Sequence, residues 1–507
     1  MGDPGENAGS REMPQAGQIS DFEEETGAAE ASSSGQQTSA NPATRFAHYA
    51  TISESWKNAI ETFTFRKLSI SEDELTDVAN IMTGRRRSYL VHLTFECKNN
   101  RDYKSLKDET EGFFRAVEFL IGLLKSWQDD GVQNQLKLKL KFRTRRHKTL
   151  RPGQLGFRRP LPVLSNLHKL CVQGDNSRCI LLAEFAALQP NLQHLNLVFT
   201  DWYRYSLTLR DVYRVAFAET LARIQLQRQP TARLTIDMCH ARETTEFRSR
   251  QIVITPERLY DPCSAAIRSC SLNLTSLRVN AFLDSTIFWP HEKEPNARSP
   301  FWPHLRTLEI MFSGLSPSGE RYFQDISDRF YGRRMRGVIS DGRQIPIPEL
   351  LDPFMASFAK AVRSMPSIDQ FRLMSSFPWD GAANAFCVSY CAPGIRTVKC
   401  MHTYPCLARD RTVEELRQYR GYIGRCFDRK LESDEELLFR RLTYDVFTGW
   451  SPSEEVAWSL RCAGQEKYGG RLIETFRSQW ERKKTVEYFD PEDLLEDGRP
   501  AKRAKKC

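Results

Sequence analysis

The sequence predicts an α/β fold in which short strands and helices alternate along most of the 507-residue chain. Three observations predict it. Apolar residues recur at positions i, i+3 and i+5 in seven places, as in strands that bury one face. In four of the seven, a proline stands two residues before the first apolar position, where it would end a helix. Helical patterns precede several of these segments. The expected unit is a helix, a stop and a strand.

The apolar triplets mark the expected strands. Because 40% of the residues are hydrophobic, so loose a spacing also arises by chance, and the preceding prolines carry more weight. The triplets are Leu90/Leu93/Phe95, Leu167/Leu170/Val172, Leu192/Leu195/Leu197, Leu274/Leu277/Val279, Leu305/Leu308/Ile310, Ile368/Phe371/Leu373 and Ile395/Val398/Cys400. The prolines are Pro190, Pro303, Pro366 and Pro393. Two further strands are expected at 136–142 and around Leu234 and Ile236.

Helices are expected before two of the prolines and in the last hundred residues. Residues 180–188 precede Pro190, and apolar residues at four-residue steps from Phe354 to Val362 precede Pro366. From about residue 407 the pattern becomes helical and charged, with helices expected over 412–422, 433–441 and 451–462. The last begins with Ser451-Pro452-Ser453-Glu454, in which Ser451 would be the N-cap and Pro452 the first helical residue.

The triplet resembles the LxxLxL strand of leucine-rich repeats, whose inward face stacks on neighbouring repeats. Successive triplets begin 77, 25, 82, 31, 63 and 27 residues apart, and the long intervals are near multiples of 25 to 31. The resemblance implies an irregular leucine-rich-repeat-like solenoid over residues 84–406, closed by a helical cap over 407–489. An α/β fold of another type would leave similar traces.

Charge and composition set the two ends of the chain apart. Residues 1–44 carry eight acidic residues and one arginine, a balance of −7, and are rich in small and polar residues. They are predicted to be a disordered acidic tail. Because the whole chain has a net charge of +9, the remainder carries +16, and five of these charges lie in the last nine residues. Residues 490–507 are predicted to be a disordered basic tail.

A compact region is expected to begin at about residue 45. Apolar residues follow one another at three- and four-residue steps, as on one face of an amphipathic helix or helix pair. They are Phe46, Tyr49, Ile52, Trp56, Ile60 and Phe63. This pattern assigns a small helical segment to residues 45–83.

One motif, which begins in this segment and ends at Leu93, resembles a known family. It reads Tyr49-Ala50-Thr51-Ile52-Ser53 with Trp56, then Ile60-Glu61, Thr64-Phe65, Arg85-Arg86-Arg87 and Tyr89-Leu90 with Leu93. It is similar to the second half of the F-box, and the segment after it, in large families of fungal F-box proteins. The resemblance implies that the apolar face, Phe46, Tyr49, Ile52, Trp56 and Ile60, binds a Skp-type adaptor. The repeat array would then recognise a protein substrate for a cullin-type ubiquitin ligase.

Two alternatives to this interpretation stay open. The first half of the F-box, a Leu-Pro-x-Glu-Ile helix followed by a second apolar helix, has no counterpart in residues 1–44. The first alternative is therefore that the chain is a nuclear scaffold, which has kept the repeat array but no longer binds the ligase adaptor. Alternatively, Tyr49, Trp56 and Phe65 belong only to the core of an unrelated domain.

Two basic segments are candidate binding or targeting sequences. The run Arg499, Lys502, Arg503, Lys505 and Lys506 is typical of a nuclear import signal, with a solvated tail as the alternative. Residues 137–159 hold ten basic residues and no acidic one, including Arg143, Arg145, Arg146 and Lys148. This segment could bind nucleic acid or an acidic protein, although the alternation over 136–142 is also that of a strand with one wet face.

Other functional classes lack their usual sequence signals. The sequence has no GxxxxGK[ST], GxGxxG, HExxH or GxSxG motif, so no catalytic residue, enzyme activity or cofactor is predicted. Cys387, Cys391, Cys400, His402 and Cys406 lie close together but without a CxxC pair, and buried cysteines are expected rather than a metal site. No apolar stretch is long enough for a membrane helix, and a nuclear or cytoplasmic location is expected.

Overall fold

The computed structural model describes residues 53–97, 106–142, 157, 159–201, 207–224, 232–240, 254–255, 258–294, 298–325, 344–376, 386–396, 435–446, 450–477 and 484–488. All of them lie in one compact unit, residues 41–507. The predicted helix over 412–422 and both predicted tails, 1–44 and 490–507, lie outside the described residues.

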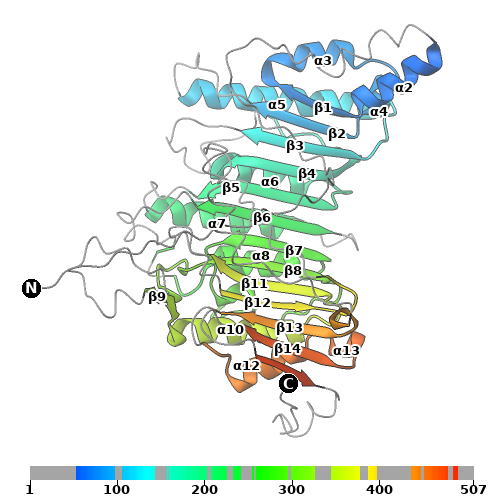
Figure 1. Ribbon diagram of the computed structural model, residues 1–507. Helices are drawn as coiled ribbons and strands as arrows, with labels where there is room; N and C mark the ends of the chain where they lie inside the picture. The colour runs from blue at the N-terminus through cyan, green and yellow to red at the C-terminus, as the bar shows by residue number, and fades with distance from the viewer. Residues whose placement is uncertain are drawn as a thin grey trace, which may run out of the picture. The chain divides into compact units, whose positions relative to one another are not determined.

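The main feature of this unit is a 13-stranded sheet whose strand order follows the chain (Figure 1). Strands β1 to β8 pair in parallel, each with the next strand in sequence, and β11 pairs in parallel with β8. Their bounds are β1 Lys67–Ser71, β2 His92–Cys97, β3 Leu136–Phe142, β4 Leu167–Asp175, β5 His194–Asp201, β6 Arg233–His240, β7 Ser276–Ala281, β8 Thr307–Ser313 and β11 Gln370–Ser376.

The sheet ends in strands of mixed direction. Strand β12 (Phe386–Cys391) is antiparallel to both of its neighbours, β11 and β13 (Arg440–Asp445). Strand β14 (Leu472–Arg477) is parallel to β13, and β15 (Lys484–Tyr488) is antiparallel to β14. Strands β9 (Phe323–Asp325) and β10 (Gln344–Pro346) form a separate antiparallel pair.

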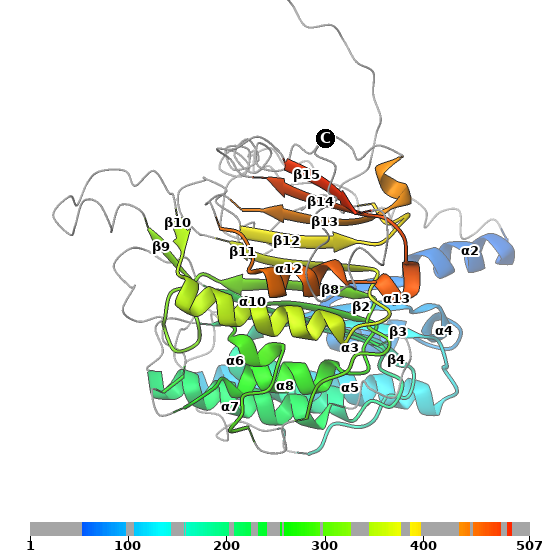
Figure 2. The ribbon, with the colours of Figure 1, turned by 90° about the horizontal axis from the view of Figure 1, so that it is seen from below.

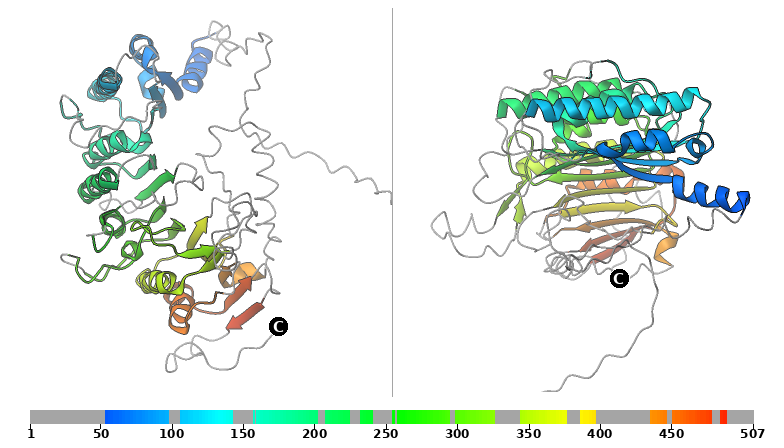
Figure 3. Two further views of the ribbon diagram at one scale, coloured as in Figure 1. Left: turned by 90° about the vertical axis from the view of Figure 1, so that its left-hand side faces the viewer. Right: turned by 90° about the horizontal axis from the view of Figure 1, so that it is seen from above.

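Helices cover one face of the large sheet (Figures 2 and 3). Rings from the two layers meet there: the centroids of Phe199 on β5 and Phe217 on α7 are 5.2 Å apart, and those of Phe371 on β11 and Phe358 on α10 are 5.1 Å apart. The covering helices are α5 Leu106–Asp129, α6 Asn176–Ala187, α7 Leu207–Arg223, α8 Pro262–Ser271, α10 Pro348–Arg363 and α12 Glu454–Arg461. The remaining α-helices are α2 Glu54–Phe65, α3 Leu75–Ile81, α4 Arg86–Tyr89 and α13 Gln465–Tyr468. No helix of the described residues is both long and apolar enough to cross a membrane.

The apolar triplets form two rows beneath these helices. In six of the seven triplets the second and third residues lie on a strand, and all three residues are buried. The strand register aligns them across the sheet in two rows. One is Leu93, Leu138, Leu170, Leu195, Leu234, Leu277, Leu308 and Phe371; the other is Phe95, Leu140, Val172, Leu197, Ile236, Val279, Ile310 and Leu373. Burying each such side chain contributes about 1.5–3 kcal/mol, so the rows are a main source of stability.

The two helices predicted before Pro190 and Pro366 are confirmed, although each begins earlier than predicted, at Asn176 and Pro348. Helix α6 ends at Ala187, and the chain then passes Pro190 into β5; likewise α10 ends at Arg363, before Pro366 and β11. The predicted start of the last helix, at Ser451, is wrong by two residues. Ser453 is the N-cap of α12, because its side chain accepts a hydrogen bond from the amide of Val456 at 3.4 Å.

The sheet continues through residues 440–488, where a helical cap was expected. A strand occupies Arg440–Asp445, where the predicted helix over 433–441 would end. The Arg440 side chain is buried and donates hydrogen bonds to the carbonyls of Arg461, Ala463, Gly469 and Gly470 at 2.9–3.1 Å. In the sequence, the charged pair Arg440-Arg441 suggests a solvent-exposed segment. In the structure, backbone carbonyl oxygens take the place of solvent around the Arg440 guanidinium.

A buried ion pair fixes the next strand to α12. Glu474 on β14 is fully buried and lies beside Leu442 in the continuation of one apolar row. Both of its carboxylate oxygens accept hydrogen bonds from Arg461 at the end of α12, at 2.9–3.1 Å. A charged residue is tolerated in this apolar row because its partner also satisfies its hydrogen bonds.

Candidate functional site

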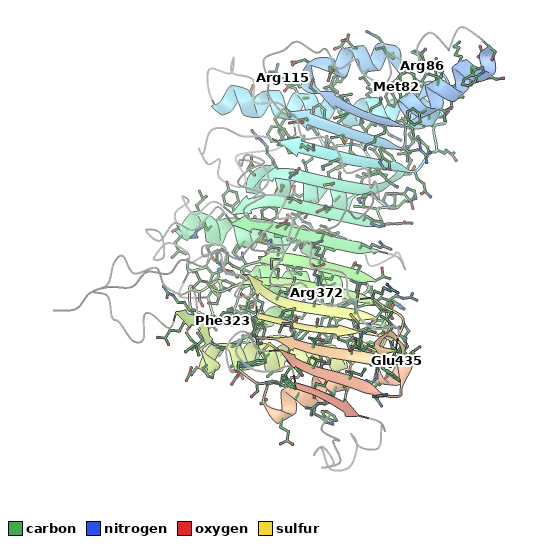
Figure 4. All side chains as sticks on the ribbon, viewed as in Figure 1. Met82, Arg86, Arg115, Phe323, Arg372 and Glu435 are labelled. Carbon is green, nitrogen blue, oxygen red and sulfur yellow. The ribbon has the colours of Figure 1, made fainter. Side chains whose placement is uncertain are left out.

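The sheet face opposite the helices carries a row of basic side chains. The register aligns one basic residue from each of six successive strands, close to the amino ends of the strands. They are Lys67, His92, Lys137, Lys169, His194 and Arg233, called the basic row below. The lysines and the arginine of the row are exposed, while both histidines are half-buried. Figure 4 views the sheet from the side of this face, on which Arg372 is labelled.

The position of the basic row follows from strand geometry. Each member directly precedes a leucine of the first apolar row or, for Lys67, the half-buried Leu68. Since successive side chains of a strand point to opposite faces, burying the leucines presents the basic residues on the other face. Neighbouring strands are about 4.8 Å apart, so the row extends over about 24 Å.

The charges in the basic row reinforce one another. Partial burial lowers the pKa of His92, and the positive charges of Lys137 and Lys67 lower it further. Partial burial also lowers the pKa of His194, together with the charges of Arg233 and Lys169. Every charged group that shifts these two histidines is a cation, so the row is a site of positive potential that favours a bound anion.

The row ends at β6. In the same register position the next three strands carry Ser276, Thr307 and Gln370. Beyond this point the Arg278 side chain lies 3.6 Å from the Glu309 carboxylate on the same face. The basic row is therefore confined to the first six strands.

Part of the same face is buried on the later strands. Met311 on β8, Met374 on β11 and Cys387 on β12 form a small apolar cluster, separate from the main core and opposite the helices. All six residues of β12 are buried. Exposed functional groups of this face therefore concentrate on the N-terminal strands.

Helix α2 presents a second exposed surface. Ser53 caps it by accepting a hydrogen bond from the amide of Trp56 at 3.2 Å. No residue of the helix is buried; Trp56 is 56% exposed and Phe63 74% exposed, while Ile60 is half-buried. Of the predicted adaptor-binding residues, Phe46, Tyr49 and Ile52 lie outside the described residues.

The arginines that follow this helix anchor it. The Arg86 guanidinium donates to the Glu61 carboxylate of α2 at 2.8 and 3.1 Å, and lies 5.1 Å from the centre of the Phe65 ring. Arg86 is labelled in Figure 4. Arg87 instead pairs with Asp130 and lies 5.8 Å from the centre of the Trp127 ring. Arg86 is thus in direct contact with two other residues of the F-box-like motif, Glu61 and Phe65.

Several predicted site residues lie outside the described part of the chain. Arg143, Arg145, Arg146 and Lys148, which directly follow β3, lie outside the described residues. So does the basic run Arg499, Lys502, Arg503, Lys505 and Lys506. Cys387 and Cys391 lie on β12, whereas Cys400, His402 and Cys406 are outside the described part of the chain. Within that part, no group of three metal-ligating side chains comes together.

The basic row itself was not predicted from the sequence. Its members are far apart in the chain, and each strand contributes only one. A signal was present, because a lysine, histidine or arginine directly precedes Leu68, Leu93, Leu138, Leu170, Leu195 and Leu234. It becomes visible only when the strands are aligned by their second apolar position.

Comparison with known proteins gives no assignment, since no family model, no curated protein and no solved structure matches this chain.

Proposed function

We propose that this protein is a non-catalytic binding protein, built as an irregular leucine-rich-repeat-like array, that recognises a protein partner through the sheet face opposite the described helices. The observation that carries the proposal is the alignment of the strands. Parallel strands in sequence order bury two apolar rows against the helices, and the described helices leave the polar face with the basic row open. Repeat proteins bind partners on such extended surfaces.

We further propose that helix α2 docks on a Skp-type adaptor, which would make the protein the substrate-recognition subunit of a cullin-type ubiquitin ligase. Two exposed aromatic side chains on one helix, Trp56 and Phe63, support this role, because large aromatic residues dominate protein interfaces. They are seven residues apart and therefore share a helix face. The anchoring of α2 by Arg86 would hold this face in place.

The proposal assigns the protein to the nucleus or cytoplasm. The C-terminal basic run would act as the import signal in the first case. A tagged fluorescent fusion with Lys502, Arg503, Lys505 and Lys506 changed to alanine tests this part, and an unchanged distribution between nucleus and cytoplasm would contradict a role in import.

Co-purification from cells tests the ligase assignment. A tagged full-length chain should bring down a Skp-type adaptor, and a Trp56→Ala/Phe63→Ala variant should lose it with an unchanged denaturation midpoint, because neither side chain is buried. A matched control is Phe119→Ala/Phe301→Ala, which removes two aromatic side chains that are 48% and 57% exposed elsewhere. This control should retain the adaptor.

The alternative function is a scaffold without a ligase link. If the wild-type chain brings down no Skp-type adaptor while its sheet face still binds a partner, the ligase assignment is wrong and the scaffold interpretation stands. If neither surface binds a protein, the proposed function as a whole is wrong.

A further inference from the structure

We propose that the basic row binds an acidic polypeptide segment that lies extended across strands β1 to β6. This inference rests on the proposed function and adds to it the chemistry of the partner. It concerns the sheet face alone and does not depend on whether α2 binds an adaptor.

The dimensions of the row fit an extended chain. Five inter-strand steps of about 4.8 Å give about 24 Å, which an extended peptide spans with about seven residues. In such a peptide, alternate side chains point to the same side about 6.7 Å apart. Long lysine and arginine side chains can adjust over the remaining difference, so several carboxylates could be paired at once.

Charge complementarity favours an anionic partner. The row holds four permanent cations, Lys67, Lys137, Lys169 and Arg233, and no acidic residue. Lys137 and Lys169 are direct neighbours on adjacent strands, where like charges repel and destabilise the pair. A bound carboxylate would offset this repulsion, and the same cations would increase the rate of encounter.

The rows beside it favour a polypeptide over a nucleic acid. The adjacent row carries, in order, Ser69, Thr94, Lys139, Cys171, Asn196 and Thr235. Its hydroxyl and amide side chains can hydrogen-bond to a peptide backbone, and Lys139 adds one more cation. No phenylalanine, tyrosine or tryptophan lies on this face of β1 to β6, so bases would find no stacking platform among these described strands.

The third row also opposes a phosphate backbone. Glu96 on β2 and Asp237 on β6 lie on the same face, near both ends of the basic area. A nucleic-acid strand carries a charge at every nucleotide and would meet both carboxylates, whereas a peptide can place neutral residues there. Lys139 and Lys141 of β3 extend the basic area into these two rows, and Glu96 and Asp237 bound it, which suits an acidic segment of limited width.

Fluorescence anisotropy of the full-length chain with a labelled peptide of about ten residues, alternating Asp and Ser, tests the proposal. A Lys137→Gln/Lys169→Gln/Arg233→Gln variant should bind at least about tenfold more weakly, because each exposed charge pair contributes up to about fivefold. The matched control, Arg115→Gln/Lys125→Gln/Arg223→Gln, removes three cations from helices α5 and α7 and should bind as the wild type does.

A charge reversal separates recognition from misfolding. Lys137→Glu/Lys169→Glu/Arg233→Glu should lose the Asp/Ser peptide and gain affinity for a matching Lys/Ser peptide. Equal binding of the Asp/Ser peptide by the wild type and the Gln variant would overturn the proposal. It would leave the adaptor result untouched, so the two failures can be told apart.

A third arm tests the class of partner. A single-stranded DNA of the same formal charge, titrated at the same salt concentration, should bind more weakly than the Asp/Ser peptide. Tighter binding of the DNA, lost in the Gln variant, would show that the row is a nucleic-acid site and overturn the peptide assignment.

Discussion

Arg214 on helix α7 and Asp261 at the start of α8 form a fully buried ion pair, with the Arg214 Nε 2.9 Å from the Asp261 Oδ1. Burial alone would raise the pKa of Asp261, but the positive charge of Arg214 and the hydrogen bonds from Arg214 and Ser264 hold it below its usual value. Arg214 also donates to the Phe282 carbonyl at 2.9 Å, just after β7. The pair therefore joins two helices and the sheet.

Replacing Arg214 by methionine should destabilise the protein by about 3–5 kcal/mol, because the variant leaves an unpaired carboxylate inside the core. Denaturation monitored by circular dichroism measures this change. Arg223→Ala on the same helix is the control: Arg223 pairs with Glu184 at the surface, 59% and 42% exposed, so its loss should cost under about 1 kcal/mol. Equal effects of the two substitutions would contradict the special role of the buried pair.

The two faces of β7 should respond differently to truncation. Leu277, 3% exposed, lies in the first apolar row, and Leu277→Ala should cost about 2–5 kcal/mol through lost burial and a cavity. The adjacent Arg278 lies on the opposite face, and Arg278→Ala should change stability by under about 1 kcal/mol. The midpoints of chemical denaturation compare the two, and a larger loss for Arg278→Ala would contradict the assigned orientation of the strand.

These faces also show how much of the fold the sequence predicts. The apolar triplets locate six strands and name their inward residues, because burial of one strand face imposes a spacing that survives in the sequence. Strands β12 and β13 could not be located in this way. Every residue of β12 is buried, so it has no alternation, and β13 begins with Arg440, whose burial depends on carbonyls some 20 to 30 residues away.

The candidate site is harder to predict than the fold. Lys169 and Arg233 are 64 residues apart in sequence, and only the register of β4, β5 and β6 brings them onto one row. The exposed Trp56 and Phe63 present the opposite difficulty, since the sequence marks them as apolar but not whether a core covers them. Their exposure follows from the tertiary position of α2.

Loss of Arg86 should free helix α2. Because no residue of α2 is buried, its attachment depends strongly on the contacts of Glu61 and Phe65 with Arg86. Arg86→Ala should increase amide hydrogen exchange over residues 54–65 several-fold, with little change in β4 to β8. Lys57→Ala, which removes only an exposed contact with Glu54 at 3.7 Å, is the control and should leave exchange unchanged.

Acidification should strengthen peptide binding to the basic row. Partial burial lowers the pKa of His92 most, and the positive charges of Lys137, Lys67, Lys169 and Arg66 lower it further. A bound carboxylate would raise this pKa, because its negative charge favours the protonated imidazole. Binding should therefore take up protons, and the Kd for the Asp/Ser peptide should fall between about pH 7.5 and about pH 5.5.

The pKa of His194 is also lowered, mainly by partial burial and further by the charges of Arg233, Lys169 and Lys137, so a bound carboxylate would raise it as well. In a His92→Gln/His194→Gln variant the Kd should vary little over this range. Without a ligand, acidification should lower the stability of the fold. The unfolded chain binds more protons once the pH falls to about 6.5, so these two histidines should reduce stability on acidification. A Kd that rises on acidification in the wild type would contradict the prediction.

Gly464 should tolerate no side chain while Tyr390 keeps its hydroxyl. Its φ of +64° is in the left-handed region, and a Cβ there would overlap the Tyr390 hydroxyl and lie 3.1 Å from Tyr390 Cζ. Gly464→Ala should cost more than the about 1–2 kcal/mol of backbone strain alone. Gly131→Ala measures that strain, since Gly131 has a φ of +92° and no atom within 4 Å of the added Cβ.

Tyr390→Phe then isolates the steric part. Among the described residues the Tyr390 hydroxyl has no hydrogen-bond partner, so its removal alone should cost little. In the double variant Gly464→Ala/Tyr390→Phe, thermal denaturation should show recovery of part of the stability lost by Gly464→Ala, with the backbone strain remaining. Additive effects of the two substitutions would mean that the hydroxyl does not contact this turn, and that β12 does not pack against the start of α13.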